Sequence, residues 1–562
     1  MRILLAFLLL VPLASVAREP ATATRQMVAA AHPLAAEAGL SVLRRGGGAI
    51  DAAVAVQAVL GLVEPQSSGI GGGAFILHWS ERAREVSSWD GRETAPASAR
   101  PDLFLRADGT PMGFHEAAVG GRAVGVPGAV AVLDEAHRAH GMLPWEELFR
   151  DAITIARQGF AVSPRLAAAI AADRERLSRD PAARAYFFLP DGTPLPAGHI
   201  LRNEAYAATL EAIARDGADA LARGPIADAI VAAVRGAAWN PGGMTAEDLA
   251  AYRAIRRDPV CTTYRVWRVC GMGPPSSGGI AVGQILGLLG HFDLASLDPR
   301  GAEAAHLLAE ASRLAFADRN AYVADSDAVR VPVRGLLDAT YLSIRAQGID
   351  RDRATMAPRP GNPPWQDGAR LAPDDQVAER GTSHVAIVDA AGNAVSMTTT
   401  VEDAFGARVM AAGFLLNNQL TDFSFRPEID GRAVANRVEP GKRPRSSMAP
   451  SLVFDEAGAL VAVVGSPGGA RIIAYVAQAL VALLDWRLDA QAAIDLGHVG
   501  TVGGATELEA GTTAEALRAT LEARGHTVTV REMTSGLQAI LRGGGGWLGG
   551  ADPRREGVAV GD

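Results

Sequence analysis

A chain of 562 residues can bury a large core, and its length suggests more than one folding unit. Hydrophobic residues make up 48% and charged residues 21% of the chain, which is typical of a globular protein. The formal net charge is −8 and no basic stripe is present, which argues against nucleic acid as a partner.

Residues 1–17 are predicted to be a secretory signal peptide. Arg2 provides a positive start, and the apolar run at 3–13 is too short to span a bilayer comfortably. An N-terminal membrane anchor is the alternative. No other stretch approaches eighteen consecutive apolar residues. The mature protein, from about Arg18, is therefore expected to be periplasmic or secreted, with no stable membrane span.

The chain up to residue 252 is predicted to be mainly helical, with a few short strands. Helices are expected at 33–43, at 49–63 and repeatedly within 127–252, a glycine-rich turn at 64–73, and strands at 74–79 and 86–89. Arg92 follows the second of these strands. An arginine in this position can bind a carboxylate with two N–H groups, or it can be a solvated surface residue.

Cys261 and Cys270 are the only cysteines, and they lie symmetrically about Arg265-Val266. If those two residues form the loop of a hairpin, the two cysteines become a directly opposed, non-hydrogen-bonded pair with close Cα atoms. That separation suits a disulfide, and an exported protein meets oxidising conditions. We predict the bridge; two unlinked, half-buried thiols are the alternative. Two cysteines alone make no zinc site.

The middle of the chain combines a long helix with a polar stretch. Residues 303–322 are predicted to be helical, and four charged residues on this helix are expected to form surface or interhelical ion pairs: Glu310, Arg313, Asp318 and Arg319. Residues 351–380 are polar, and their prolines argue against regular structure. This stretch is interpreted either as a plain linker or as a segment that becomes a mobile tail if the chain is cut after it.

A β-hairpin is predicted directly after Gly381. Folded about Ala391, it places Thr382 opposite Thr400 with both side chains on one face. The even-numbered face is polar and carries Thr382, His384, Ser396, Thr398, Thr400 and Glu402, whereas the odd-numbered face is apolar. We interpret Thr382 as a nucleophile that becomes an N-terminus by cleavage after Gly381. An ordinary hairpin, with threonines chosen for strand propensity, is the alternative.

Polar clusters and a glycine turn follow the hairpin. An apolar strand at 413–423 ends in a polar cluster, and a basic, serine-containing stretch at 442–451 leads into the next strand. Gly468-Gly469 opens a helix at 472–486. Backbone N–H groups in such a turn can bind an anion or an oxyanion, although a tight structural turn is the alternative. The C-terminus is predicted to be a small α+β unit, with a helix at 513–524 and strands at 527–530 and 536–541.

Together these motifs resemble the γ-glutamyltranspeptidases, members of the N-terminal-nucleophile hydrolases. The resemblance runs from about Met27 to the C-terminus. It rests on eight motifs in family order, at 64–73, 90–96, 274–279, 381–384, 415–423, 442–450, 465–471 and 551–554. It implies an α+β fold, a four-layer αββα sandwich, made as one precursor. Cleavage before Thr382 would leave a large subunit, 18–381, and a small subunit, 382–562, that form a heterodimer.

The resemblance also implies a role for each candidate site residue. Thr382 would be the nucleophile and Thr400 its hydrogen-bonding partner. The backbone N–H groups of Gly468 and Gly469 would face the oxyanion. The substrate's α-carboxylate would be held by Arg92, Ser446 and Ser447, and its α-ammonium by Gln419 and Asp422. A free α-amino group on Thr382, with a pKa of roughly 8, could accept the hydroxyl proton.

Two features depart from the family pattern. Glu402 stands where transpeptidases usually carry asparagine, two residues after the second threonine. It could still bind an ammonium group, but it could also alter the preferred head group. The sequence around Glu402 is more similar to the branch that contains cephalosporin (glutaryl) acylases. The segment between Asp422 and Ser446 also looks shorter than in relatives with a lid, which would admit bulkier substrates and water.

The sequence therefore predicts an exported enzyme that cleaves γ-glutamyl amides such as glutathione, with transfer of the acyl group to water or an amino acid. The alternatives are a glutaryl- or cephalosporin-type acylase and a non-catalytic binding protein on the same scaffold. The intact set of site residues argues against the binding protein. No metal or organic cofactor is expected, and the partner is a small-molecule substrate.

Overall fold

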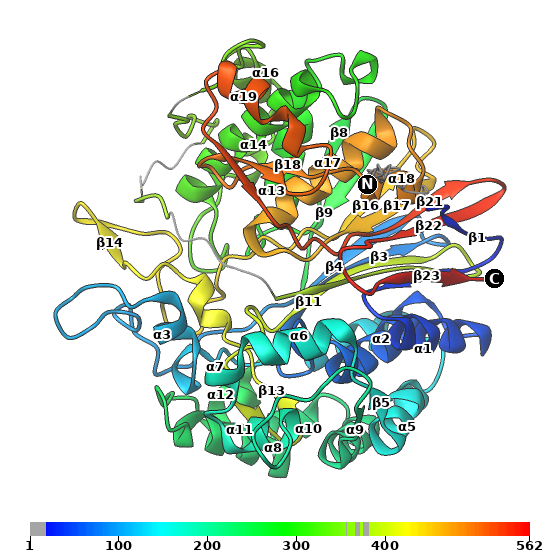
Figure 1. Ribbon diagram of the computed structural model, residues 1–562, viewed down its shortest axis with the longest axis vertical. Coiled ribbons are helices and arrows are strands. Elements are labelled where there is room, and N and C mark those ends of the chain that lie inside the picture. The colour runs from blue at the N-terminus through cyan, green and yellow to red at the C-terminus, as the bar shows by residue number, and fades with distance from the viewer. Residues whose placement is uncertain (1–17, 356, 366–370, 375–380) are drawn as a thin grey trace, which may run out of the picture.

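The computed structural model describes residues 18–355, 357–365, 371–374 and 381–562. The predicted signal peptide at 1–17 lies outside the described residues, as do parts of the polar stretch before Gly381. Two seven-stranded sheets lie face to face at the centre, with helices above and below them (Figure 1). This is the predicted αββα sandwich.

The upper sheet joins strands from both ends of the chain. Its order is β1 (Ala21–Ala23), β22 (Gly546–Ala551), β21 (Gln538–Gly543), β17 (Leu460–Gly465), β16 (Ser451–Phe454), β9 (Trp267–Gly271) and β8 (Val260–Tyr264). The lower sheet contains the predicted hairpin at its centre. Its order is β23 (Val558–Gly561), β2 (Met27–Ala30), β10 (Ser383–Val388), β11 (Ala394–Thr400), β3 (Gly73–Ser80), β4 (Glu85–Gly91) and β7 (Ile255–Arg257).

Three apolar layers hold the sandwich together. The layer between the two sheets includes Trp79, Ala386, Val388 and Phe454. The polar, even-numbered face of the hairpin therefore turns toward the upper sheet, and His384 lies fully buried against Gly465. The odd-numbered face packs against the lower helices. Both faces are buried, because strands inside a sandwich are covered on each side.

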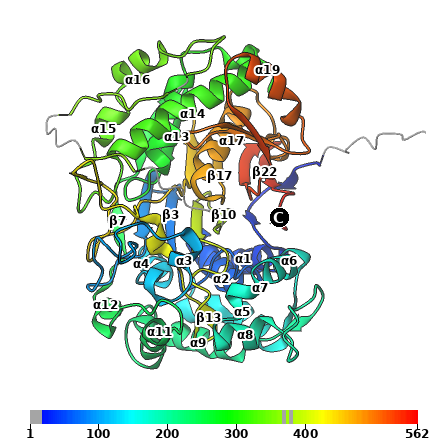
Figure 2. The same ribbon diagram turned by 60° about the vertical axis from the view of Figure 1, so that its left-hand side comes forward.

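The helices above the upper sheet lie in the same layer in both views (Figures 1 and 2). They are α13 (Gly278–Leu289), α14 (Ala302–Tyr322), α16 (Ala339–Ala346), α17 (Ile472–Leu484) and α18 (Ala490–Ile494). Their apolar side chains form one core with the outer face of that sheet.

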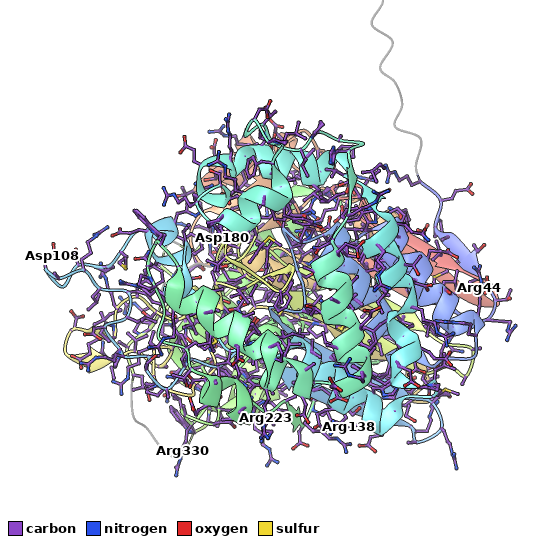
Figure 3. The ribbon with its side chains drawn as sticks, turned by 90° about the horizontal axis from the view of Figure 1, so that it is seen from below. Arg44, Asp108, Arg138, Asp180, Arg223 and Arg330 are labelled. Carbon is purple, nitrogen blue, oxygen red and sulfur yellow. A yellow bond between two sulfur atoms is a disulfide. The ribbon has the colours of Figure 1, made fainter. Side chains whose placement is uncertain are left out.

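The lower layer is built from the helical first half of the chain. It includes α1 (Pro33–Arg44), α2 (Ala49–Val63), α4 (Ala129–His140), α5 (Arg150–Gln158), α9 (Glu204–Asp216) and α11 (Pro225–Gly236). Figure 3 looks onto this layer from below. α2 is buried along nearly its whole length because it lies between β10 and β11 on one side and other helices on the other.

The cysteine hairpin forms as predicted. Tyr264 pairs with Trp267, so Cys261 lies directly opposite Cys270 on β8 and β9, and the two form a disulfide with a Cα–Cα distance of 4.0 Å. Alternation along an antiparallel pair is enough to place these two residues together.

The C-terminal unit differs from the prediction. Only β18 (Val499–Gly500), β19 (Thr506–Glu509), β20 (Val528–Arg531) and α19 (Arg518–Ala523) form a small separate unit. The strand predicted at 536–541 is instead β21, in the middle of the upper sheet, and β22 and β23 extend the two main sheets. Glycines at 543–546 and 549–550 hid β22, because glycine is depleted in strands. Among the described helices, none is long and apolar enough to cross a membrane.

Candidate active site

The predicted nucleophile lies at the start of β10, in the centre of the lower sheet. Ser383 pairs with Thr399 and His384 with Thr398, which puts Thr382 opposite Thr400, as the predicted register requires. Thr382 Oγ1 donates a hydrogen bond of 3.0 Å to Thr400 Oγ1. Thr400 Oγ1 also accepts from the backbone N–H of Glu402 at 2.8 Å. The partner hydroxyl is therefore held in place from both sides.

The backbone around Gly381-Thr382 is tightly constrained. The Thr382 N–H donates to the carbonyl oxygen of Ser67 at 2.7 Å, and its own carbonyl accepts from Arg555 Nη1 at 2.8 Å. Thr382 has φ = +95°, a region that β-branched residues rarely adopt and that costs about 1–3 kcal/mol. A Cβ added to Gly381 would lie 2.6 Å from the carbonyl carbon of Glu402. The strain is stored next to the predicted cleavage site.

A cavity opens beside the two threonines and gathers most of the predicted site. Thr382 and Thr400 line it together with Glu402, Gln419, Asp422, Ser446, Ser447 and Gly469. Arg92 and Gly468 are not among its lining residues, although both lie next to ones that are. Four lining residues were not singled out as site residues from the sequence: Arg319, Arg445, Met448 and Ile472.

Arg92 is buried behind the cavity and is already occupied. Its Nη2 donates to Asp422 Oδ2 and to the carbonyl of Arg445 (3.0 Å), and its Nε donates to the carbonyl of Pro444 (3.0 Å). Gln419 Nε2 donates to the same Asp422 oxygen at 2.7 Å. Arg92 thus neutralises Asp422 and anchors the loop that carries the serine pair.

Glu402 brings an unusual carboxyl group to the cavity. Its Oε2 accepts from Asn418 Nδ2 and from Thr421 Oγ1, but its Oε1 has no hydrogen-bond partner among the described residues. Burial, together with the charges of Asp422 and Asp403, raises the pKa of Glu402 well above its ordinary value. This environment therefore favours the protonated form of the carboxyl group. Glu402 also has φ = +82°.

The two serines have hydroxyl groups that accept from the protein. Ser446 Oγ accepts from the backbone N–H of Met448 at 3.0 Å, and Ser447 Oγ accepts from Arg319 Nη2 at 2.8 Å. Ser446 is buried and Ser447 half-buried at the cavity wall.

The helix that supplies Arg319 was only partly predicted. Asp318 pairs with Arg345 of α16 at 3.2 Å, which is an interhelical ion pair as expected, whereas Glu310 pairs with Arg313 of its own helix at 2.7 Å. Arg319 was expected to behave in the same way, but it forms no ion pair with a carboxylate of the described residues. None of the residues expected to pair is at the surface, because α14 is covered on most sides. The prediction for Arg319 was therefore wrong.

The glycine turn lies where β17 passes into α17. Gly468 and Gly469 have φ = +133° and +59°, which favours glycine at both positions. A Cβ on Gly468 would lie 2.6 Å from Cε2 of Tyr475. Gly469 lines the cavity with Thr382, so its backbone is close to the reacting centre. A role for the two N–H groups as an oxyanion hole stays a prediction.

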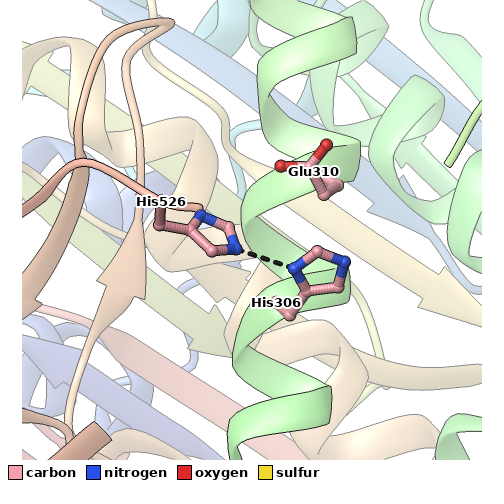
Figure 4. Close-up of side chains that lie close together, drawn as sticks. All are labelled: His306, Glu310 and His526. Atoms are coloured by element: carbon pink, nitrogen blue, oxygen red, sulfur yellow. Dashed lines mark hydrogen bonds between the residues drawn. The ribbon is translucent and has the colours of Figure 1, made fainter. Parts of the chain in front are cut away.

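One cluster outside the cavity has the composition of a metal site (Figure 4). His306 Nε2 lies 2.7 Å from the carbonyl of Asp350, so it must donate, and His306 Nδ1 accepts from His526 Nε2 at 2.7 Å. His526 Nδ1 faces an Arg313 N–H at 3.2 Å, and Glu310 pairs with the same arginine. The ring lone pairs of both histidines are used, so in this network neither imidazole has a nitrogen free to bind a metal. The network joins α14 to the C-terminal unit.

Comparison with known proteins identifies the family. The family model for gamma-glutamyltranspeptidase matches residues 35–562. The chain is 38% identical over 547 residues to a glutathione hydrolase proenzyme of Bacillus subtilis (strain 168), covering 95% of this chain and 91% of that protein. It is 37% identical to the acylase ACY 1 proenzyme of Pseudomonas sp. (strain SE83), covering 95% and 93% of the two chains. The crystal structure of cephalosporin acylase from Bacillus halodurans matches with a TM-score of 0.86, 29% identity and 99% coverage of both chains. The chain therefore belongs to the γ-glutamyltranspeptidase family.

Proposed function

We propose that this protein is a self-processing, exported hydrolase and acyltransferase that cleaves γ-glutamyl amide bonds, as in glutathione. The observation that carries the proposal is the hydrogen bond between Thr382 and Thr400 at the wall of a cavity that also contains Asp422. Family membership and the glutathione hydrolase proenzymes among the relatives support it.

Self-processing would use the same hydroxyl as catalysis. Thr382 Oγ1 attacks the carbonyl carbon of Gly381, the peptide C–N bond breaks and an ester forms. Water then hydrolyses the ester, which leaves the large subunit 18–381 and the small subunit 382–562. Cleavage removes the bond that defines φ of Thr382, so the strain at this residue is released. The proenzyme names of the relatives support such a step.

The free amino group of Thr382 then serves as the general base. In the uncut chain this nitrogen already lies 2.7 Å from the carbonyl oxygen of Ser67, which would hold it in place. The amine takes the hydroxyl proton, directly or through water, and Oγ1 attacks the γ-carbonyl of the substrate. The leaving amine takes the proton, and water or an amino group resolves the γ-glutamyl ester. Gly468 and Gly469 would stabilise the oxyanion.

The head group of the substrate would be held by opposite charges. Asp422, Gln419 and Glu402 would bind the α-ammonium, and the unpaired Oε1 atoms of Gln419 and Glu402 are free to accept from it. Ser446 and Ser447 would bind the α-carboxylate at the cavity wall, and Arg92 would add its positive charge from behind the loop that carries them. For the export part of the proposal, residues 1–17 would be the signal peptide, and the Cys261–Cys270 disulfide fits an oxidising compartment.

A glutaryl- or cephalosporin-type acylase is the second candidate. The similarity to the Bacillus halodurans acylase and the raised pKa of Glu402 favour it, because a neutral carboxyl attracts an ammonium group less than an ionised one. Rates on γ-glutamyl and glutaryl p-nitroanilides separate the two. Faster cleavage of the glutaryl compound would reject the γ-glutamyl proposal.

Self-processing is tested on a denaturing gel. The purified protein should give two bands, near two-thirds and one-third of the mature mass, and the Thr382→Ala variant should give one band and no activity. A wild-type chain that stays whole and is active would refute the mechanism.

A further inference from the structure

Arg319 is a buried cation at the wall of the catalytic cavity whose partners are all neutral. Its Nε donates to Ser277 Oγ at 2.9 Å, Nη1 to Asn320 Oδ1 at 2.9 Å and Nη2 to Ser447 Oγ at 2.8 Å. Only 6% of the residue is exposed, and no carboxylate of the described residues pairs with it. A buried charge without a counterion is costly, so an anion in the cavity would be strongly favoured.

The other arginines of the site already have carboxylate partners. Arg92 pairs with Asp422, and Arg445 pairs with Asp374 at 2.8 Å. Burial and the neighbouring Arg445 lower the pKa of Arg319, whereas the charges of Asp374 and Asp422, which do not hydrogen-bond to it, raise it; an anion in contact with Arg319 would raise it further. Among the arginines that line the cavity in the described part of the chain, Arg319 is thus the one without a counterion.

The hydrogen bond from Arg319 to Ser447 determines the direction in which the Ser447 hydroxyl can donate. A guanidinium group only donates, so Ser447 Oγ is the acceptor in that bond and its own O–H stays available. Ser446 Oγ likewise accepts from Met448 N. Neither hydroxyl has an acceptor among the described residues. Two O–H donors with a cation behind one of them form a site suited to a carboxylate.

We propose that Arg319 is a positioning residue for the substrate's carboxylate: it orients the Ser447 hydroxyl toward this group and places a positive charge behind it. The inference rests on the proposed function, because it assigns a further residue to the head-group site. The role of Arg319 would hold for either candidate function, since glutaryl and γ-glutamyl substrates both carry the carboxylate.

The test compares three p-nitroanilides on the processed enzyme. The γ-glutamyl compound carries both head groups, the glutaryl compound only the carboxylate, and the 4-aminobutyryl compound only the ammonium. Arg319→Met should lower kcat/KM for the first two roughly 10- to 100-fold, mainly through KM, and change the third by less than about twofold. Arg319→Lys should recover part of the loss. Equal losses on all three compounds would overturn the proposal, because they would indicate a structural role.

A double-mutant cycle with Ser447→Ala tests the same inference on any one carboxylate substrate. The cost of Arg319→Met should be clearly smaller when the Ser447 hydroxyl is absent, and an undiminished cost would contradict the proposal. Arg345→Met is the matched control. Arg345 lies on α16, pairs with Asp318 of α14, the helix that carries Arg319, and does not line the cavity. If Arg319→Met does not fold, the lysine variant is measured in its place.

Preference for glutaryl over γ-glutamyl anilide in the wild type would reject the proposed function while leaving the role of Arg319 intact. If the wild type instead cleaves the 4-aminobutyryl compound, which has no carboxylate, faster than the other two, the role of Arg319 would be overturned.

Discussion

Replacing Gly381 by alanine should slow self-processing without removing any reacting group. The new Cβ would lie 2.6 Å from the carbonyl carbon of Glu402, closer still to its carbonyl oxygen, and 3.3 Å from the carbonyl oxygen of Asp403. These are backbone atoms, so a side-chain rotation cannot relieve the clash. Overpacking of this kind costs about 1–3 kcal/mol.

The clash acts on the reacting geometry itself. Gly381 carries the carbonyl that Thr382 would attack, and the N–H of Glu402 orients the Thr400 hydroxyl. If the whole cost appears in the barrier, cleavage slows about 5- to 150-fold, since each 1.36 kcal/mol is a factor of ten.

The rate can be measured by pulse-labelled cell-free synthesis, with the uncut fraction followed on denaturing gels. Gly236→Ala is the matched control, because a Cβ there would meet nothing within 4 Å. Thr382→Ala marks the uncut limit. Limited proteolysis of the Gly381→Ala precursor checks that it is folded. A folded Gly381→Ala chain that cleaves as fast as the Gly236→Ala chain would refute the reasoning.

Three further predictions concern buried polar groups. Thr400→Val removes the acceptor for Thr382 Oγ1, so the rates of turnover and of processing should fall at least about tenfold. Thr400→Ser keeps a hydroxyl group and should keep most activity. Equal rates for the two variants would count against the hydrogen bond. Burial raises the pKa of Glu93 from 4.5 to about 8, so between these pH values the native state keeps a proton that the unfolded state releases. The free energy of unfolding should therefore fall as pH rises from 4.5 to 8, by up to ~5 kcal/mol. Urea titrations of uncut Thr382→Ala protein should show this slope, and adding Glu93→Gln should flatten it; an unchanged slope would exclude Glu93 as its source. Glu402 ionises as pH rises, and the ionised carboxylate should bind the ammonium group of the γ-glutamyl substrate more strongly. The ratio of KM for γ-glutamyl anilide to KM for glutaryl anilide should therefore fall with pH in the wild type and stay constant in Glu402→Gln. Parallel pH profiles for the two proteins would show that Glu402 does not contact the ammonium group.

Local pairing rules were enough to predict the two hairpins that matter most. In both, a strict alternation of period two and a short turn leave a single register, so Thr382 meets Thr400 and Cys261 meets Cys270. The family resemblance then predicted most residues of the cavity, because its motifs keep their order along the chain.

Residues whose role depends on distant segments could not be predicted in this way. Arg319 lies on an alanine-rich helix without a clear polar face, and only the packing of α14 beside the serine loop brings it to the cavity. The pairing of Arg92 with Asp422 joins residues more than three hundred positions apart. The glycine-rich β22 was missed for a related reason: glycine has low strand propensity, and pairing with neighbouring strands makes this segment a strand.

The strand order explains how the proposed cut can free the nucleophile without separating the two fragments. In the lower sheet, β10, which follows the proposed cut, pairs with β2, which precedes it, and β11 pairs with β3. β23 adds a third pairing with β2, on its other side. In the upper sheet β16 pairs with β9 and β22 with β1, so the boundary between the fragments is crossed in both sheets. These ladders and the apolar layer between the sheets do not include the Gly381–Thr382 bond, so they can hold the two fragments together after it is broken. The new amino group therefore appears on a strand that is already held in place on both edges.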